Sequence, residues 1–203
     1  SQMQFSATLY DSTNSVVTGI IEWIATNGTI DGAGLFTPWS SGNVSITAVS
    51  EGISDSLNLT VEPGWPSALF VYGNLSEVGL DSSVQLTASL VDSRGNEVLG
   101  QILTWSPSQG NVSEDGVWTP SQIGNASIEV HWGELSATIE ITVIPGQAAT
   151  ITLPSGLSVR AGEWISFSPS IHDSYGNLLQ ISSVGSLQWN AESGTITAGM
   201  SST

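Results

Sequence analysis

The chain has 203 residues, no cysteine, and a formal net charge of −16 from 18 acidic residues against two basic ones. Disulfides are therefore excluded, and so strongly negative a chain repels nucleic-acid phosphates and anionic lipid, which argues against such partners. Apolar residues make up 39% of the chain, which favours folded domains with buried cores over a disordered segment.

No apolar run approaches the roughly 18 to 20 residues that a membrane-spanning helix needs. No signal peptide opens the chain either. We therefore expect no membrane insertion in this segment, and any leader or anchor of a parent protein would lie outside it.

One nine-residue pattern occurs three times along the chain, at residues 4–12, 85–93 and 166–174. Its aspartates stand at positions 11, 92 and 173 and are therefore 81 residues apart both times. Self-similarity at a fixed period indicates an array of like modules. Such an array provides reach or multivalency, whereas catalysis needs only one site.

Other markers recur at offsets of 82 to 84 residues and define three repeats. A tryptophan recurs as Trp23, Trp105 and Trp189, and the pair Pro63-Gly64 recurs as Pro145-Gly146. We expect repeat 1 at residues 1–64, lacking its first strand. Repeat 2 is expected complete at 65–146, and repeat 3 at 147–203, truncated at its C-terminal end.

Strict alternation of apolar and polar residues predicts half-buried strands at 84–91, 126–131 and 137–143. Turn-forming residues at 92–96, 114–116 and 132–134 separate them. About seven short strands within some 80 residues are typical of an immunoglobulin-like sandwich. The predicted fold is therefore all-β: tandem immunoglobulin-like antiparallel β-sandwiches.

The recurring tryptophans Trp23, Trp105 and Trp189 are the predicted structural core of the repeats. Trp105 falls on the third expected strand, where such a sandwich usually buries an indole. Trp65 lies between Pro63-Gly64 and Pro66, and we expect it to wedge the joint between repeats 1 and 2.

The spacing of several motifs resembles that of bacterial Ig-like (Big) domains, the invasin- and intimin-like modules of prokaryotic cell-surface proteins. The resemblance covers the whole chain and rests on residues 86–98, Leu103-Thr104-Trp105-Ser106, Gly116-Val117-Trp118-Thr119-Pro120 and Gly124-Asn125-Ala126-Ser127-Ile128, with counterparts in the other two repeats. It implies tandem sandwiches in adhesins, stalks or appendages at the surface of bacterial or archaeal cells. The family has no shared catalytic site, so the resemblance assigns no functional residue.

No residues form a recognisable catalytic or cofactor-binding motif, and we expect no enzyme. A structural calcium ion is the one cofactor considered, because calcium takes six to eight oxygen ligands that loops can supply. The candidates are Glu62, Glu77 and Asp81, expected near the joint between repeats 1 and 2. For the repeat aspartates we favour hydrogen bonding to their own turns over calcium binding.

Six Asn-x-Ser/Thr sequences are possible glycosylation sites of an extracellular protein. They lie at Asn27, Asn43, Asn58, Asn74, Asn111 and Asn125. Asn43 and Asn125 occupy equivalent places in repeats 1 and 2.

Three functions remain open at this point. The first is a non-catalytic stalk or spacer of an extracellular repeat protein or surface filament, whose partners are neighbouring modules of the same parent chain. The second is an adhesin-type module that recognises glycan or protein. The third is a filament subunit whose incomplete repeats are completed by strand exchange between like chains.

Overall fold

The computed structural model describes residues 2–196, and its regular structure is β-sheet apart from the 3-10 turn η1 (Ile181–Ser183). No helix among these residues is long and apolar enough to cross a membrane. The predicted all-β, immunoglobulin-like fold is confirmed.

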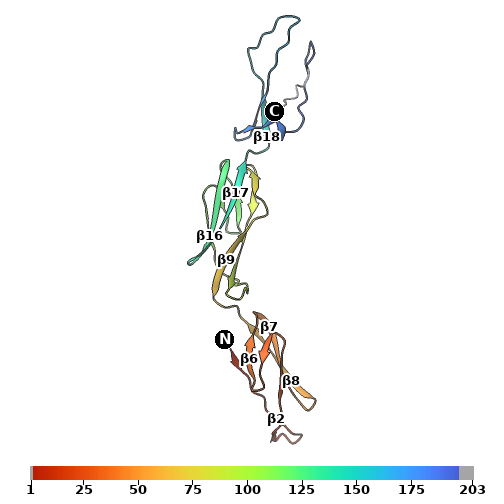
Figure 1. Cartoon of the computed structure of the whole chain (residues 1–203), viewed down its shortest axis with the longest axis vertical. Coiled ribbons are helices and arrows are strands. Elements are labelled where there is room, and N and C mark those ends of the chain that lie inside the picture. The colour runs from red at the N-terminus through yellow and green to blue at the C-terminus, as the bar shows by residue number, and fades with distance from the viewer. Residues whose placement is uncertain (1, 197–203) are drawn as a thin grey trace. The chain divides into compact units, whose positions relative to one another are not determined.

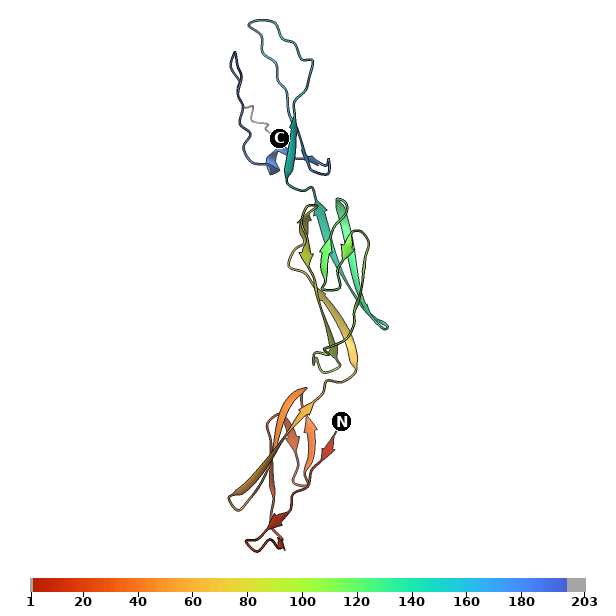
Figure 2. The ribbon, with the colours of Figure 1, turned by 180° about the vertical axis from the view of Figure 1, so that it is seen from behind.

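Repeat 1 contains two three-stranded sheets and one short hairpin. The sheets have the strand orders β1-β6-β5 and β4-β7-β8, and β2 pairs with β3. The hairpin of β7 and β8 is seen in orange in Figure 1 and from behind in Figure 2. The strands are β1 (Met3–Gln4), β2 (Leu9–Tyr10), β3 (Val16–Val17), β4 (Glu22–Ala25), β5 (Gly28–Ile30), β6 (Leu35–Pro38), β7 (Gly42–Ser50) and β8 (Ile53–Val61).

Repeat 2 has sheets of the orders β10-β17-β16-β13, β11-β15-β14 and β12-β9. Its strands are β9 (Pro66–Tyr72), β10 (Glu77–Gly79), β11 (Val84–Gln85), β12 (Thr87–Asp92), β13 (Thr104–Pro107), β14 (Asn111–Val112), β15 (Val117–Thr119), β16 (Gly124–Trp132) and β17 (Leu135–Ile144). The predicted strand at 84–91 is divided into β11 and β12 at Leu86, which is one reason why the segments outnumber the expected seven.

Repeat 3 contributes one sheet, β18-β19-β20, formed by β18 (Ala148–Thr152), β19 (Ser170–Asp173) and β20 (Leu178–Leu179). Phe167 and Trp189 pack edge to face, with ring centroids 5.5 Å apart. The predicted C-terminal limit of this repeat, residue 203, lies outside the described residues.

The alternation of residue types explains which side chains form the core. Along β16, Ala126, Ile128 and Val130 are fully buried, and the residues between them are not. Period-two geometry sends successive side chains to opposite faces. Sequence alternation therefore predicts the buried face of this strand correctly.

By backbone contacts, the chain forms two compact units. One comprises residues 1–71, 88–104 and 130–137, and the other comprises 72–87, 105–129 and 138–203. These limits fall within repeat 2, and the three-module division remains a prediction from the sequence.

The Gly-x-aromatic-Thr-Pro motif begins with a glycine that no other residue could replace without strain. Gly34 and Gly116 have φ of 81° and 80°, in the left-handed region that glycine alone adopts freely. A β-carbon at Gly34 would lie 2.5 Å from the Phe5 carbonyl oxygen, and one at Gly116 would lie 2.6 Å from that of Leu86. The recurrence of this glycine therefore has a steric cause.

Candidate functional site: aspartate turns that hold the linkers

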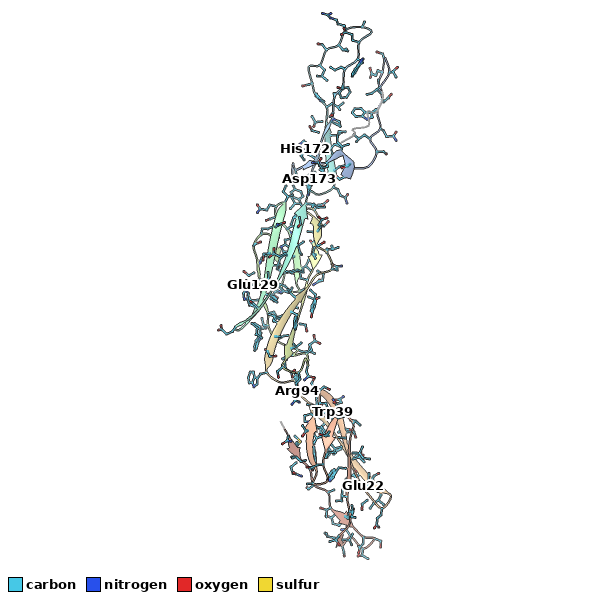
Figure 3. All side chains as sticks on the ribbon, viewed as in Figure 1. Glu22, Trp39, Arg94, Glu129, His172 and Asp173 are labelled. Carbon is cyan, nitrogen blue, oxygen red and sulfur yellow. The ribbon has the colours of Figure 1, made fainter. Side chains whose placement is uncertain are left out.

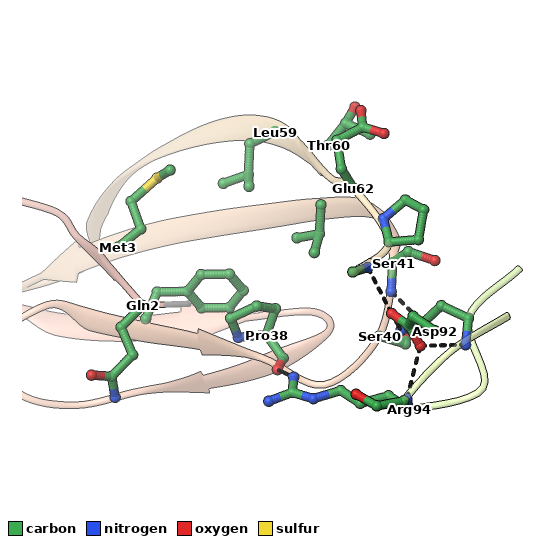
Figure 4. Close-up of a pocket in the computed structure, with 16 residues that line it drawn as sticks. Gln2, Met3, Pro38, Ser40, Ser41, Leu59, Thr60, Glu62, Asp92 and Arg94 are labelled. Carbon is green, nitrogen blue, oxygen red and sulfur yellow. Dashed lines mark hydrogen bonds between the residues drawn. The ribbon is translucent and has the colours of Figure 1, made fainter. Parts of the chain in front are cut away.

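The most distinctive polar site is the turn after β12, where the Asp92 carboxylate accepts four hydrogen bonds. Its Oδ1 accepts from the backbone amides of Arg94 at 2.8 Å and Asn96 at 2.9 Å. Its Oδ2 accepts from the Asn96 side-chain amide at 2.9 Å and from the Gly64 amide at 2.7 Å. Gly64 belongs to the Pro-Gly linker, so one carboxylate both closes its own turn and holds the preceding linker (Figure 4).

The same arrangement recurs one period later at Asp173. Its Oδ1 accepts from the amides of Tyr175 at 2.9 Å and Asn177 at 2.8 Å. Its Oδ2 accepts from the Asn177 side chain at 2.9 Å and from the Gly146 amide of the second Pro-Gly linker at 2.9 Å. Figure 3 labels Asp173 and also Arg94 of the equivalent turn in repeat 2.

Asp11 closes the same kind of turn, and its donors among the described residues all come from the turn itself. Its Oδ1 accepts from the amides of Thr13 at 2.8 Å and Ser15 at 3.0 Å, and from the Thr13 hydroxyl at 2.7 Å. Asp11 is exposed, whereas Asp92 and Asp173 are only 5% and 2% exposed. Asparagine follows four residues after the two buried aspartates, while serine stands at that place after Asp11.

These hydrogen bonds stabilise the ionised carboxylates. The Asn96 side chain, followed by the Gly64 amide, holds the pKa of Asp92 well below its usual range against the opposing effect of burial. For Asp173, burial opposes ionisation, but the donors from Asn177, Gly146 and Tyr175 together lower the pKa to about 2. The Ser15 amide and the two donors of Thr13 also lower the pKa of Asp11.

The four hydrogen bonds at each of Asp92 and Asp173 occupy the acceptor sites that a ligand would need. An ionised carboxylate has about four lone-pair sites, and at Asp92 and Asp173 four donors are present. These aspartates therefore act as structural acceptors, in agreement with the interpretation favoured from the sequence.

Further polar contacts hold each linker region. At the first, the Ser41 amide donates to Asn96 Oδ1 at 3.0 Å, and Arg94 Nη1 donates to the Pro38 carbonyl at 3.1 Å. At the second, the Gln147 amide donates to Asp81 Oδ2 at 3.0 Å. Two successive linker amides, those of Gly146 and Gln147, are thus bound by two different carboxylates, Asp173 and Asp81.

Both linker glycines allow close approach of a carboxylate. A β-carbon at Gly64 would lie 3.1 Å from Asp92 Oδ2, and one at Gly146 would lie 2.9 Å from Asp81 Cγ. The repeated glycine after proline therefore makes room for the acid that holds the linker.

The three calcium candidates do not gather at the joint between repeats 1 and 2 as expected, because Asp81 lies at the second linker. Glu62 follows β8, Glu77 begins β10, and Asp81 holds the Gln147 amide. Within residues 2–196, the structure contains no group of three or more His, Cys, Asp or Glu side chains placed to bind a metal. Calcium binding stays a prediction.

The recurring tryptophans lie at the margins of the cores. Trp23 and Trp105 are half-buried and pack against the buried clusters of repeats 1 and 2, and Trp189 is half-buried beside Phe167. The fully buried aromatic residues are Phe36 and Trp118. The Gly-x-aromatic-Thr-Pro motif marks this central position and is the sequence signal for it.

Trp65 differs from its prediction. Its side chain is 88% exposed, so it does not wedge the joint. The linker is held instead by the hydrogen bond that the neighbouring Gly64 amide donates to Asp92, which needs no apolar contact.

The sequon asparagines are mostly exposed. Asn43 accepts a hydrogen bond from the Thr60 hydroxyl at 3.2 Å, and the equivalent Asn125 accepts one from Thr142 at 3.3 Å. Asn27 is half-buried and bonds Ser40. The remaining three, Asn58, Asn74 and Asn111, are exposed. Glycosylation at any of them stays a prediction.

No family model matches the sequence, and no curated protein matches it. Several solved structures are similar to the chain. The chain is similar to FdeC, an Escherichia coli adhesin, with 19% identity and a TM-score of 0.55 over 82% of this chain and 67% of that one. It is similar to Yersinia pseudotuberculosis InvD, with 21% identity and a TM-score of 0.50 over 85% of this chain and 65% of that one.

A further match is to domains 1–6 of the surface layer protein SbsC, with 23% identity and a TM-score of 0.37 over 84% of this chain. The chain spans 28% of that SbsC structure. At the identities of FdeC and InvD, the likeness shows the fold alone: this chain is built from immunoglobulin-like β-sandwich modules.

Proposed function

We propose that the chain is a non-catalytic stalk or spacer segment of an extracellular repeat protein or surface filament of a prokaryote. The observation that carries the proposal is the repeated capture of the linker amides of Gly64 and Gly146 by Asp92 and Asp173. Charge-assisted hydrogen bonds of this kind are stronger than neutral ones. A spacer needs linkers that keep their geometry, and a free Pro-Gly linker would not.

The location follows from the same proposal. The similar protein FdeC is an adhesin by its description, and a chain without cysteine can fold outside the cell by packing alone. The partners are then neighbouring modules of the same parent chain. The scattered acidic surface keeps such an array soluble.

Small-angle scattering of the full chain tests this function. We expect an extended particle for the wild type and a broader, more flexible distribution of distances for the double variant Asp92→Asn/Asp173→Asn. Asp11→Asn, which removes a turn carboxylate without a linker bond, is the matched control and should scatter like the wild type. A compact globule for the wild type would contradict the stalk.

The second candidate is an adhesin-type module that recognises glycan or protein. It is favoured by large aromatic side chains left in solvent, namely Trp39, Trp65 and Trp164, because aromatic residues are frequent at binding hot spots. Screening the chain against glycan and surface-protein arrays tests this. Binding that is lost in Trp65→Ala or Trp164→Ala would support it, and a screen without binding would count against it.

A further inference from the structure

Three exposed side chains gather where repeat 1 meets the aspartate turn of repeat 2. We call residues 38–41, 62–66 and 92–96 the first joint, and all of them belong to one compact unit. Trp39 is 64% exposed and Trp65 is 88% exposed. Arg94, one of only two basic residues in the chain, is also exposed, and Figure 3 labels it together with Trp39. The first joint thus presents two indoles and a guanidinium to solvent.

Hydrogen bonds bring the backbone of these three residues together. The Gly64 amide bonds at 2.7 Å to the aspartate of the turn that contains Arg94, and Trp65 directly follows Gly64. The Arg94 guanidinium donates to the Pro38 carbonyl at 3.1 Å, and Trp39 directly follows Pro38 (Figure 4). Residues that are far apart in the sequence therefore meet at one place on the surface.

The backbone around both indoles is restricted. Pro38 precedes Trp39, and Trp65 is followed by Pro66. Proline fixes its own φ, and it also narrows the conformations of the residue before it. An indole side chain adds only two torsions of its own. Binding a ligand here orders few torsions, which favours affinity.

The second joint, which contains the Pro145-Gly146 linker, shows that exposure belongs to these positions. The equivalent residues are Ser121, Gln147 and Tyr175. All three are exposed. Repeat 2, which precedes this joint, contains both β9 and β10, and neither strand covers these positions. What distinguishes the first joint is therefore the chemistry of its exposed side chains.

The remaining side chains of the first joint restrict the class of ligand. Its three segments contain no Leu, Ile, Val, Met or Phe, and the residues between the indoles are mainly Pro, Ser, Gly, Asn and acids. A protein partner is bound most tightly through an apolar centre from which water is excluded. A saccharide instead presents C–H groups on the faces of its rings and hydroxyls that both donate and accept hydrogen bonds. Isolated indoles among polar groups fit a saccharide better than a protein.

Arg94 and Glu62 provide the polar contacts that such a ligand needs. A guanidinium carries five N–H donors, and that of Arg94 has no hydrogen-bond partner among residues 2–196 other than the Pro38 carbonyl. Glu62 is exposed in the same joint and supplies acceptor oxygens. The formal charge of −16 disfavours a polyanion. These groups together favour a neutral saccharide.

We propose that the first joint binds a neutral saccharide, with Trp39 and Trp65 packed against its rings and with Arg94 and Glu62 bonded to its hydroxyls. The inference rests on the second candidate function, adhesion, and names its site and ligand class. It is compatible with a spacer, because the same hydrogen bonds that hold the linker also position the site.

Calorimetric titration of the full chain with unbranched hexasaccharides of glucose, mannose, galactose and N-acetylglucosamine tests the proposal. We expect at least one of these probes to bind at one site per chain, with an affinity that is the same at low and high salt because the ligand is uncharged. Trp39→Ala and Trp65→Ala should each weaken binding by about tenfold or more. Trp164 is also 88% exposed but lies outside the first joint, so Trp164→Ala is the matched control and should bind like the wild type.

Arg94→Gln gives a further variant of the site. Glutamine can still donate to the Pro38 carbonyl, but it lacks the charge and most of the donors of arginine. We expect several-fold weaker binding. Hydrogen exchange at the Gly64 amide should be unchanged in this variant and in both tryptophan variants, which separates loss of a ligand contact from loss of the joint.

The possible failures distinguish this site from adhesion in general. Saccharide binding that persists in both Trp39→Ala and Trp65→Ala, or that is lost only in Trp164→Ala, would overturn the site and leave the adhesin function standing. Failure of all four probes to bind would overturn the proposal. Binding on a surface-protein array that Trp39→Ala abolishes would then show that the joint recognises protein, and the absence of any binding on that array would count against adhesion as well.

Discussion

Repeats 1 and 2 share their motifs but differ in the size of their cores. Around Trp118, eight further buried apolar residues form one cluster, whereas Phe36 is joined by only Val44 and Ile46. Two of the additional residues in repeat 2, Val78 and Leu80, come from the β10 segment, which has no counterpart among residues 2–64. The β10 segment thus adds two buried apolar side chains to the core of repeat 2.

The difference between the two cores predicts that the largest loss of stability follows replacement of the buried aromatic residue, Trp118 in repeat 2 or Phe36 in repeat 1. Trp118→Ala should reduce the free energy of unfolding of repeat 2 by about 3–5 kcal/mol, since it leaves a large cavity in a closed core. Phe36→Ala should reduce the free energy of unfolding of repeat 1 by about 3 kcal/mol, the lower end of this range, because the smaller core of repeat 1 can collapse around the cavity. Denaturant unfolding followed by hydrogen exchange in each repeat measures both, and a greater loss at Phe36 would contradict the comparison.

A smaller effect is expected at the motif glycine. Gly116→Ala should cost about 3 kcal/mol, because the added β-carbon overlaps the Leu86 carbonyl in a left-handed conformation. Gly95 is the matched control, since its φ of 81° is close to the 80° of Gly116 but no atom lies within 4 Å of its β-carbon position. Gly95→Ala should cost only about 1 kcal/mol, and equal losses at the two sites would show that the overlap is unimportant.

Because the pKa of Asp173 is lowered in the folded chain, stability should depend on pH in the acid range. The folded-state pKa of Asp173 is lowered to about 2, so its contribution to stability is complete above the ordinary carboxyl pKa of about 4 and is lost as pH falls through the folded value. Wild-type stability should therefore decline between about pH 4 and pH 2. Asp173→Asn should be less stable at neutral pH and show a flatter acid profile, and an unchanged profile would contradict the role assigned to the carboxylate.

The parts of this fold that depend on residues close together in the sequence can be predicted from the sequence. Alternation identifies the buried face of β16, and the spacing of Asp92 and Asn96 predicts a closed turn. The linker bonds were not predicted, because Gly64 and Asp92 are 28 positions apart and nothing local indicates that they meet. The most buried aromatic position is also not indicated by recurrence of one residue type. Trp105 recurs as tryptophan and packs at the margin of the core, whereas the fully buried Trp118 is replaced by Phe36 in repeat 1.

The exposed Trp65 illustrates the same limit. Its position between two prolines suggests a packed wedge, but the side chain lies in solvent and the linker is held by the hydrogen bond from the Gly64 amide to Asp92. Residue type alone does not show whether a joint is held by apolar contact or by hydrogen bonds.

Hydrogen exchange at the two linker amides tests the central claim most directly. We expect the Gly64 and Gly146 amides of the wild type to be protected at neutral pH. Each should exchange at least roughly tenfold faster when its own acceptor, Asp92 or Asp173, is changed to asparagine, since one hydrogen bond is lost. Asp11→Asn should leave both amides unchanged. Linker amides that exchange freely in the wild type, or equally in all three variants, would contradict the claim that carboxylates hold the linkers.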